Sequence, residues 1–233
     1  MIILYDFKSE GVVGSPSPFV LKIETFLRLA DLDFEKRHVA LPTKAPKQKL
    51  PYIVDDGEVV CDSAFIIEHA KRKHGVDLDA WLSDAQLAVA HAARKMIEES
   101  TYWTAVYARW MDEANWPTTA KMFFRKFPIP LKWIAPGVAR KKVGKTLEAQ
   151  GYGRHSRDEI YHMGVQDVAA LEGILADHQY LMGDKPAVVD ASAFGLLAQL
   201  AYGTVSAPHA DYVRNSATLM PYCDRIRARC FPE

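Results

Sequence analysis

The chain has 233 residues, 49% of them hydrophobic and 25% charged, which is typical of a globular protein with one large domain or two modest ones. Lys and Arg balance Asp and Glu at 29 each, so the overall charge predicts attraction neither to nucleic acid nor to a membrane surface. No apolar stretch approaches the roughly 20 residues that cross a bilayer, and the N-terminus lacks the basic start of a signal peptide. Three cysteines without Cys-x-x-Cys spacing predict neither disulfides nor a zinc site, so a reducing cytoplasm is the expected compartment.

Residues 1–76 alternate between strand and helix patterns. The apolar run Ile2-Ile3-Leu4-Tyr5 predicts a buried strand, and from Phe19 the apolar residues recur with the spacing of one helix face. Residues 33–40 have the pattern of an edge strand. Together these patterns predict a strand, a helix and a second strand.

A hairpin and a second helix follow. Residues 50–54 and 58–61 predict its two strands, and Asp55-Asp56-Gly57 supplies the usual turn chemistry between them. Asp62 and Ser63 are both N-cap residue types, and the apolar run that follows them predicts a helix. The predicted N-terminal order is therefore β-α-β-β-β-α.

The rest of the chain has helical periodicity and no convincing strand pattern. Residues 77–83 predict a linker, and residues 84–233 predict an all-helical domain. Ser156 and Glu159 form the sequence pattern of a capping box at the start of one helix. The predicted helices cover residues 84–111, a segment that starts near 130, residues 156–178, a buried core helix at 191–202, and about residues 210–229.

The most informative motif joins a Leu-Pro strand start to an acidic helix cap. Proline at the start of a buried strand needs a special setting, such as a cis peptide that turns the backbone of Leu50 outward to pair with an extended peptide ligand. Asp62 follows Pro51 by eleven residues. With Ser63 and free amides at a helix N-terminus, it forms a receptor for an α-amino acid head group, with the ammonium on Asp62. The alternative is a strand-start proline followed by an ordinary serine cap.

This arrangement resembles the N-terminal domain of the glutathione transferase family. The resemblance implies a thioredoxin-like α/β domain followed by an all-α domain, with glutathione between them. It implies a cis Pro51, pairing of Leu50 with the glutathione cysteine, and γ-glutamyl binding by Asp62 and Ser63. The glutathione-binding residues expected on this basis are Ser17, Phe19, Lys47, Lys49, Leu50, Pro51, Asp62 and Ser63, with Lys47 or Lys49 on the glycine carboxylate.

The loop Ser15-Pro16-Ser17-Pro18 lies before the first helix, where backbone amides and the helix dipole favour an anion. A hydroxyl there can donate to a bound thiolate and lower the pKa of the glutathione thiol. The resemblance aligns Ser17 and Val20 with the two cysteines of redox-active relatives, so disulfide-exchange chemistry is not expected. Ser17 is the expected thiolate donor, Ser15 is a rival for that role, and a Ser-Pro turn that only caps the helix is the third possibility.

A narrower resemblance spans nearly the whole chain. Ser-Pro-Ser-Pro-Phe-x-Leu-Lys, Gly-Tyr-Gly-Arg-His-Ser-x-x-Glu and the ending Tyr-Cys-x-Arg-x-Arg-x-x-Cys-Phe-Pro-Glu are similar to bacterial relatives of failed-axon-connections and metaxin proteins. One departure concerns the buried helix, because transferases carry Ser or Thr three residues before its Asp190, and this chain has Ala187. Loss of that side-chain cap costs about 1 kcal/mol unless another group replaces it.

The helical part offers a candidate second-substrate pocket. Its residues are aromatic side chains with one cation among them: Tyr102, Trp103, Tyr107, Arg109 and Trp110. Such a wall suits a hydrophobic electrophile with a polar or anionic tail, and a core or domain-interface stripe explains the same residues equally well. Residues 114–147 hold eight Lys or Arg and no acid, and we interpret them as a solvated face rather than a membrane contact.

The expected function is conjugation of glutathione to a small hydrophobic electrophile in a cytoplasmic homodimer, with no metal. The histidines show no metal-ligand spacing, and His91, alone on its predicted helix, is interpreted as structural. The alternative is a non-enzymatic module that uses the transferase fold to bind proteins or lipids.

Overall fold

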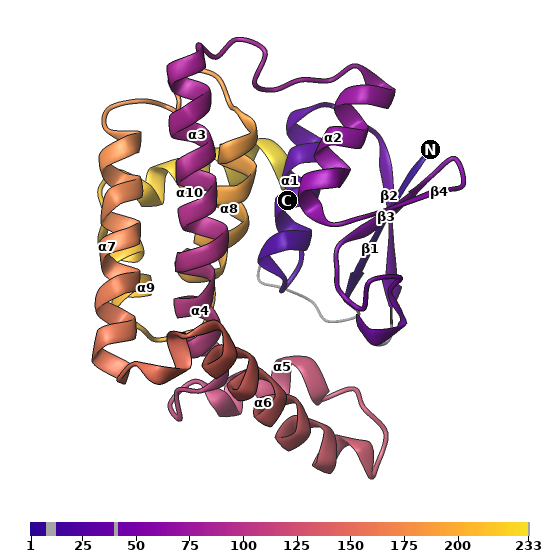
Figure 1. Ribbon diagram of the computed structural model, residues 1–233, viewed down its shortest axis with the longest axis vertical. Coiled ribbons are helices and arrows are strands. Elements are labelled where there is room, and N and C mark those ends of the chain that lie inside the picture. The colour runs from indigo at the N-terminus through magenta and orange to yellow at the C-terminus, as the bar shows by residue number, and fades with distance from the viewer. Residues whose placement is uncertain (8–12, 40–41, 233) are drawn as a thin grey trace.

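The computed structural model describes residues 1–7, 13–39 and 42–232, as a four-stranded sheet with two helices and a mostly helical remainder (Figure 1). The strands are β1 (Ile2–Phe7), β2 (Phe34–Val39), β3 (Tyr52–Asp55) and β4 (Glu58–Cys61). The α-helices are α1 (Pro18–Leu29), α2 (Ser63–His74), α3 (Asp84–Met96), α4 (Tyr102–Trp110), α5 (Trp116–Phe124), α6 (Leu131–Gln150), α7 (Arg157–Leu175), α8 (Val188–Ala201), α9 (Pro208–Asn215) and α10 (Leu219–Cys230). Shorter turns are η1 (Pro42–Lys44), the π-helical η2 (Ile97–Thr101) and η3 (Tyr152–Arg154).

The sheet has the strand order β2-β1-β3-β4, with β1 parallel to β2 and antiparallel to β3. The hairpin of β3 and β4 has a two-residue turn at Asp56 and Gly57, whose φ angles are 50° and 89°. Positive φ at both positions matches the twist of the flanking strands, which explains the Asp-Gly sequence. The order of strands and helices predicted for the N-terminal part, β-α-β-β-β-α, is confirmed, and β2 lies at the sheet edge as predicted.

Helix α1 lies between the sheet and the helical part, where α8 packs along it (Figure 1). The predicted apolar face is confirmed, since Phe26 and Leu27 are fully buried. Gly195 brings the two helices close together. A Cβ on Gly195 would lie only 2.5 Å from the carbonyl oxygen of Pro18.

The helix predicted over residues 84–111 is one continuous helical segment that contains a π-helical turn. This turn, η2, separates α3 from α4 and holds Glu98, which contacts α1. A π-helical turn inserts one residue into the helix and is frequent at functional sites. Periodicity alone did not predict it, because a single inserted residue barely changes the spacing.

Two features of the helical part differ from the prediction. Helix α5 was not predicted, since its nine residues are too short for a clear repeat. The helix predicted over 210–229 is divided into α9 and α10. At the break, Ser216 and Thr218 donate to the carboxylate of Glu172, and the Ser216 hydroxyl also accepts from the Leu219 amide at 2.8 Å.

The predicted core helix is α8, all of whose residues are buried. As expected, Ala187 provides no side-chain cap, and Asp79 from the segment before α3 replaces it by accepting from the Val188 amide at 2.8 Å. Asp190 accepts from the backbone amides of Ala187 and Leu181 and from the Tyr222 hydroxyl, at 2.8–2.9 Å. Burial raises the pKa of Asp190 to about 6 despite these three donors.

Candidate functional site

The N-terminus of α1 presents Ser17 as its N-cap residue. The Ser17 hydroxyl accepts from the Val20 amide at 3.4 Å, and proline follows at the first helical position. In the part of the chain that the structure describes, no acceptor takes the Ser17 hydroxyl hydrogen. The half-buried side chain is therefore free to donate to an anion above the helix N-terminus.

Ser15 has a different environment, because it is fully buried. Its hydroxyl donates to the Asp6 carboxylate at 2.6 Å and accepts from the Ser17 amide at 3.1 Å. Asp6 is itself buried at the end of β1 and lies 3.3 Å from the ammonium of Lys36. Ser15 therefore fixes the loop to the sheet, and its only hydrogen is already donated.

The same loop is held from the helical side by Arg109 of α4 and Gln199 of α8. The Arg109 guanidinium donates to the Pro16 carbonyl at 2.9 Å and to the Gln199 side chain at 3.1 Å. Gln199 in turn donates to the Ser15 carbonyl at 2.9 Å. Arg109 was expected to face a second substrate, or to belong to a core or domain-interface stripe. In the structure its guanidinium holds the loop that carries Ser17, and the residue also lines a hollow together with Asn115 and Gln199.

The Leu50–Pro51 peptide bond is cis, as the resemblance implied. Asp62 is the N-cap residue of α2 and accepts from the Ala64 amide at 2.9 Å, in an exposed position. Ser63, the first residue of α2, is 5% exposed, and its hydroxyl accepts from Lys22 at 3.0 Å. The Leu-Pro strand start and the acidic cap are adjacent in space, since the Asp62 amide reaches the Pro51 carbonyl at 3.4 Å.

A buried polar network joins the two helix N-termini to the helical part. The Lys22 ammonium, on α1, donates to Ser63 and to the carboxylate of Glu98 at 2.6 Å, and Ser192 of α8 donates to the same carboxylate oxygen at 2.9 Å. Lys22 is 1% exposed, and burial lowers its pKa even though Glu98 opposes the shift. Sequence reasoning did not assign a role to this lysine. The signal that could have identified Lys22 is a charged residue within the first, largely apolar, predicted helix.

Lys47 and Lys49 lie in the segment between η1 and β3 and are both exposed. The Lys47 ammonium lies 5.4 Å from the centre of the Phe65 ring on α2, so it is beside the helix that carries Ser63. Neither lysine belongs to the buried Lys22 network. Both remain expected contacts for a carboxylate at the outer end of a bound peptide.

The structure separates the aromatic residues expected in one pocket. Tyr102 packs edge-on against Phe19 of α1, with the ring centres 4.9 Å apart, and against Trp103, with the ring centres 5.1 Å apart. Tyr107 instead packs on Tyr161 of α7, on the core side. Trp110 stacks on Phe123 of α5 at 5.4 Å, in a cluster with Trp116 and Phe124. A small hollow lies beside Tyr102, lined by Pro18, Phe19, Lys22, Ile97, Glu98, Tyr102, Ser192 and Leu196.

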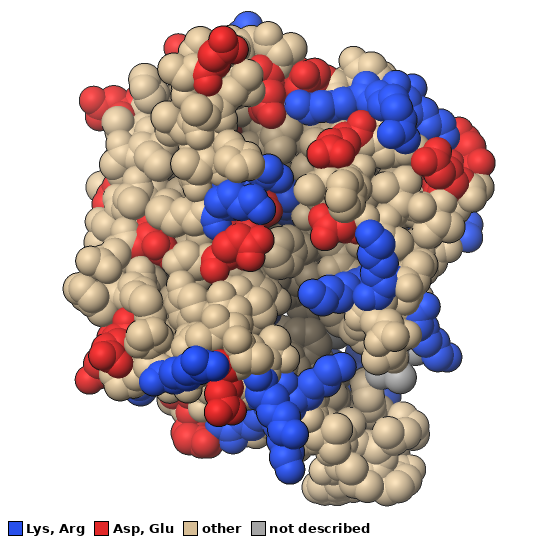
Figure 2. Space-filling view, in the orientation of Figure 1, with Lys and Arg blue, Asp and Glu red and all other residues tan. Residues whose placement is uncertain are grey.

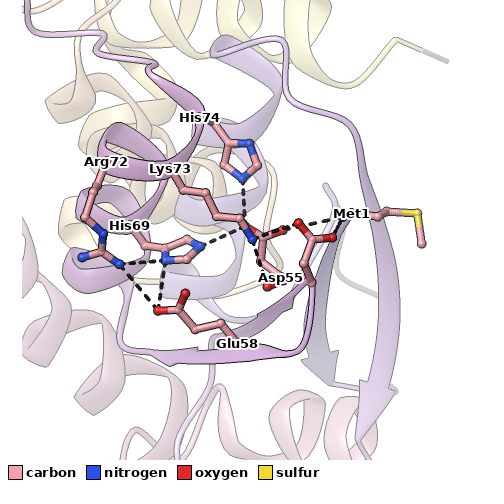
Figure 3. Close-up of polar contacts among 8 residues, drawn as sticks. Met1, Asp55, Glu58, His69, Arg72, Lys73 and His74 are labelled. Carbon is pink, nitrogen blue, oxygen red and sulfur yellow. Dashed lines mark hydrogen bonds and ion pairs between the residues drawn. The ribbon is translucent and has the colours of Figure 1, made fainter.

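Among the described residues, Asp55, His69 and His74 form a group whose nitrogen and oxygen atoms lie within 4.8 Å of one another, as metal ligands do (Figure 3). The spacing of the histidines did not predict this group, because the third member lies on β3. The imidazoles contact one Asp55 oxygen at 2.9 and 2.8 Å, and the Lys73 ammonium lies 3.1 Å from the same oxygen. A cation there opposes a metal ion, so the group serves as an ion cluster that joins the end of α2 to the hairpin.

The three cysteines lie away from the N-terminus of α1. Cys61 is half-buried at the end of β4, and Cys223 and Cys230 are buried in α10. Burial raises the pKa of the Cys230 thiol to about 11 and raises that of Cys223 further. A disulfide-exchange enzyme needs a thiolate, and these two thiols stay protonated at neutral pH.

A thioredoxin-like sheet, a cis proline at its third strand and an acidic-Ser helix cap beside a helical domain define the class of glutathione-binding transferase folds. Two family models match the chain: "Glutathione S-transferase N-terminal domain" over residues 18–115 and "Glutathione S-transferase, C-terminal domain" over residues 164–226. Isoprene-epoxide–glutathione S-transferase of Rhodococcus sp. (strain AD45) is 34% identical, with 97% of this chain and 98% of that protein aligned. The chain therefore belongs to the glutathione transferase family, a family of transferases.

Two other relatives carry different names. Failed axon connections of Drosophila melanogaster is 31% identical over the whole of this chain, which spans 59% of that protein. Metaxin-1 of Macaca fascicularis is 27% identical over 91% of this chain and 69% of its own length. The predicted resemblance to both kinds of protein is confirmed.

Solved structures confirm the fold. Glutathione transferase GSTFuA3 from Phanerochaete chrysosporium has a TM-score of 0.70 at 16% identity, with 100% of this chain and 98% of that chain aligned. Glutathione S-transferase CsGST63524 of Ceriporiopsis subvermispora, in complex with glutathione, has a TM-score of 0.64 at 17% identity, with 98% and 96% aligned. None of the helices in the described part of the chain is long and apolar enough to cross a membrane.

Proposed function

We propose that this protein conjugates glutathione to a small hydrophobic electrophile, with the Ser17 hydroxyl donating to the glutathione thiolate. The observation that carries the proposal is the contrast between the two serines before α1. Ser17 caps the helix with its hydrogen available, whereas Ser15 has donated its hydrogen to Asp6. The thiolate also gains from the helix dipole, so the thiol pKa of bound glutathione falls toward neutral.

The two ends of glutathione have separate contacts in this proposal. The backbone of Leu50, before Pro51, holds the cysteinyl unit. Asp62 takes the γ-glutamyl ammonium, and Ser63 takes its carboxylate together with the amides of α2. Lys22 supports this part, because it donates to the Ser63 hydroxyl oxygen and so leaves the hydroxyl hydrogen available for the carboxylate. Lys47 or Lys49 meets the glycine carboxylate.

The electrophile belongs in the hollow beside Phe19, two residues after Ser17, and Tyr102, which packs edge-on against Phe19. An epoxide is the favoured class, because the Rhodococcus relative is named for one. The sulfur attacks an epoxide carbon, the S–C bond forms as the C–O bond breaks, and the oxygen takes a proton from water. No metal or redox cofactor enters this scheme. A homodimer in the cytoplasm remains part of the proposal.

The test is the apparent thiol pKa of glutathione bound to three proteins, followed by thiolate absorbance across pH, together with turnover of a small epoxide. Ser17→Ala should raise the thiol pKa and slow turnover, while wild type and Ser15→Thr, which keeps the hydroxyl, share a low pKa. A pKa that is unchanged in Ser17→Ala contradicts the proposed role of Ser17. Failure of glutathione to bind the wild type would favour the non-enzymatic alternative.

A further inference from the structure

The start of α6 is the most exposed apolar part of the described molecule. Five of the ten exposed large hydrophobic side chains belong to the ten residues from 129 to 138: Ile129, Leu131, Trp133, Ile134 and Val138. Trp133 is 74% exposed and Ile129 is 75% exposed. We call these five side chains the apolar tip. Exposed apolar side chains grouped in this way on a folded protein mark a contact with another molecule or a membrane.

The apolar tip protrudes from the rest of the molecule. In Figure 1, α5 and the first turns of α6 extend below the sheet and the helical bundle. Figure 2 shows this region as an uncharged knob at the lower right, with Lys and Arg side chains gathered where it joins the body. A protruding knob can enter a planar surface without any steric obstacle from the rest of the chain.

Basic residues continue the same face of the helix. At about 100° per residue, Leu131, Ile134 and Val138 share one stripe with Lys141, Lys142 and Lys145, within an arc of about 100°. All three lysines are exposed, and residues 114–147 contain eight Lys or Arg and no acid. At a helical rise of about 1.5 Å per residue, the apolar part of the stripe is about 10 Å long, and the three lysines lie directly beyond it along the helix. We call Lys141, Lys142 and Lys145 the basic collar. An apolar end followed by these cations matches the acyl layer and then the headgroup layer of a bilayer.

We propose that the apolar tip inserts into the interface of a membrane rich in anionic phospholipids, with Lys141, Lys142 and Lys145 at the headgroup phosphates. Sequence reasoning expected a solvated face here, because the apolar residues and the cations had not yet been seen on one exposed stripe. The rival occupant is a second copy of this chain. A symmetric contact through the same patch would bring two basic collars together, and like charges oppose it.

The experiment is flotation of the untagged protein with vesicles of phosphatidylcholine alone and of phosphatidylcholine with phosphatidylglycerol. Wild type should float with the anionic vesicles about tenfold more than with the neutral ones, and salt should weaken that binding. Ile134→Glu and Lys141→Glu/Lys142→Glu should each reduce binding by about tenfold or more. Val89→Glu, at an exposed apolar position on α3, is the matched control and should float like wild type.

The depth to which the apolar tip inserts is measured by the quenching of tryptophan fluorescence by brominated lipids. Quenching should occur in wild type and be largely lost in Trp133→Phe, since the other tryptophans lie outside the tip. Equal flotation of Ile134→Glu and Val89→Glu, or no flotation of wild type at low salt, would overturn the proposal. A wild-type dimer that Ile134→Glu converts to a monomer, without vesicle binding, would assign the tip to a second copy instead.

Discussion

Gly195 of α8 and Pro18 of α1 lie so close that a Cβ on the glycine would meet the Pro18 carbonyl oxygen at 2.5 Å and the Lys22 amide at 3.0 Å. These backbone atoms belong to the first and second turns of α1, whose N-cap is Ser17. The helix that forms the centre of the helical part therefore sets the position of the proposed thiolate donor directly, through backbone contact.

Replacement of Gly195 by alanine should push the first turn of α1 away from α8. Because backbone cannot yield as a flexible side chain does, we expect a loss of about 1–3 kcal/mol of unfolding free energy, measured by denaturant titration. Glutathione affinity should fall as well. Gly173→Ala on α7, where a Cβ meets nothing within 4 Å, should instead stabilise the protein by about 0.5–1 kcal/mol. Equal stabilities of the two variants would contradict the close contact.

Glutathione binding should depend on the charge of Asp62. Asp62→Ala removes a charge-assisted hydrogen bond to the ligand ammonium, which should weaken binding by about 1.5–3 kcal/mol in a calorimetric titration. Asp62→Asn retains an N-cap side chain and should therefore keep the stability of wild type while losing most of the affinity. Wild-type affinity in the Asn variant would show that Asp62 acts only as a helix cap.

Arg109 should act on the reaction through the loop that carries Ser17. In Arg109→Met, the Pro16 carbonyl and Gln199 lose their donor, so Ser17 becomes less well positioned. We expect a raised thiol pKa for bound glutathione and a lower kcat, with a smaller change in KM for glutathione. Arg157→Met, which removes an ion pair between the exposed Arg157 and the buried Asp112, away from the loop that carries Ser17, is the control and should leave both quantities unchanged. A change in KM for the electrophile alone would return Arg109 to the second-substrate pocket.

Asp190 should be among the most sensitive positions for stability. Asp190→Ala leaves two backbone amides and the Tyr222 hydroxyl without an acceptor in a buried site, and we expect a loss of about 3–5 kcal/mol of unfolding free energy. Asp224 also accepts from a tyrosine, Tyr202, but it is exposed, so Asp224→Ala should cost less than about 1 kcal/mol. Similar losses in the two variants would show that burial does not decide the cost.

His209 should make the protein less stable as the pH falls from about 6.5 to 4. Burial lowers its pKa to about 4, and its ring nitrogens have no hydrogen-bond partner in the described part of the chain. The unfolded chain binds the proton first, so stability is complete above about pH 6.5 and declines by about 3 kcal/mol down to pH 4. In His209→Phe this part of the decline should disappear, whereas His155→Phe, at an exposed position, should follow wild type. Parallel pH profiles for wild type and His209→Phe would contradict a buried neutral imidazole.

The amino-acid sequence by itself determined the order of elements and the local features of the site. The resemblance to glutathione transferases implied the cis proline after Leu50 and the missing cap at Ala187. The Asp-Gly hairpin turn and the N-caps of α1 and α2 follow from neighbouring residues, and neighbours in sequence are always neighbours in space. The same local signals identified Ser17, Asp62 and Ser63 as site candidates. They made Ser17 the expected thiolate donor and left Ser15 as a rival, because both precede the same helix.

Only the tertiary structure showed that the Ser15 hydroxyl donates to Asp6, and only it revealed the groups that act across elements. The end of β1 brings Asp6 to Ser15. Lys22 of α1 and Ser192 of α8 donate to the same Glu98 oxygen only because α1 packs on α8. Such contacts join residues 9 to 94 positions apart, and periodicity carries no information on which distant side chains meet. The aromatic residues of α4 divide between the hollow, the core side and the cluster on α5 for the same reason, since the helices packed around α4 determine which of its faces remains open.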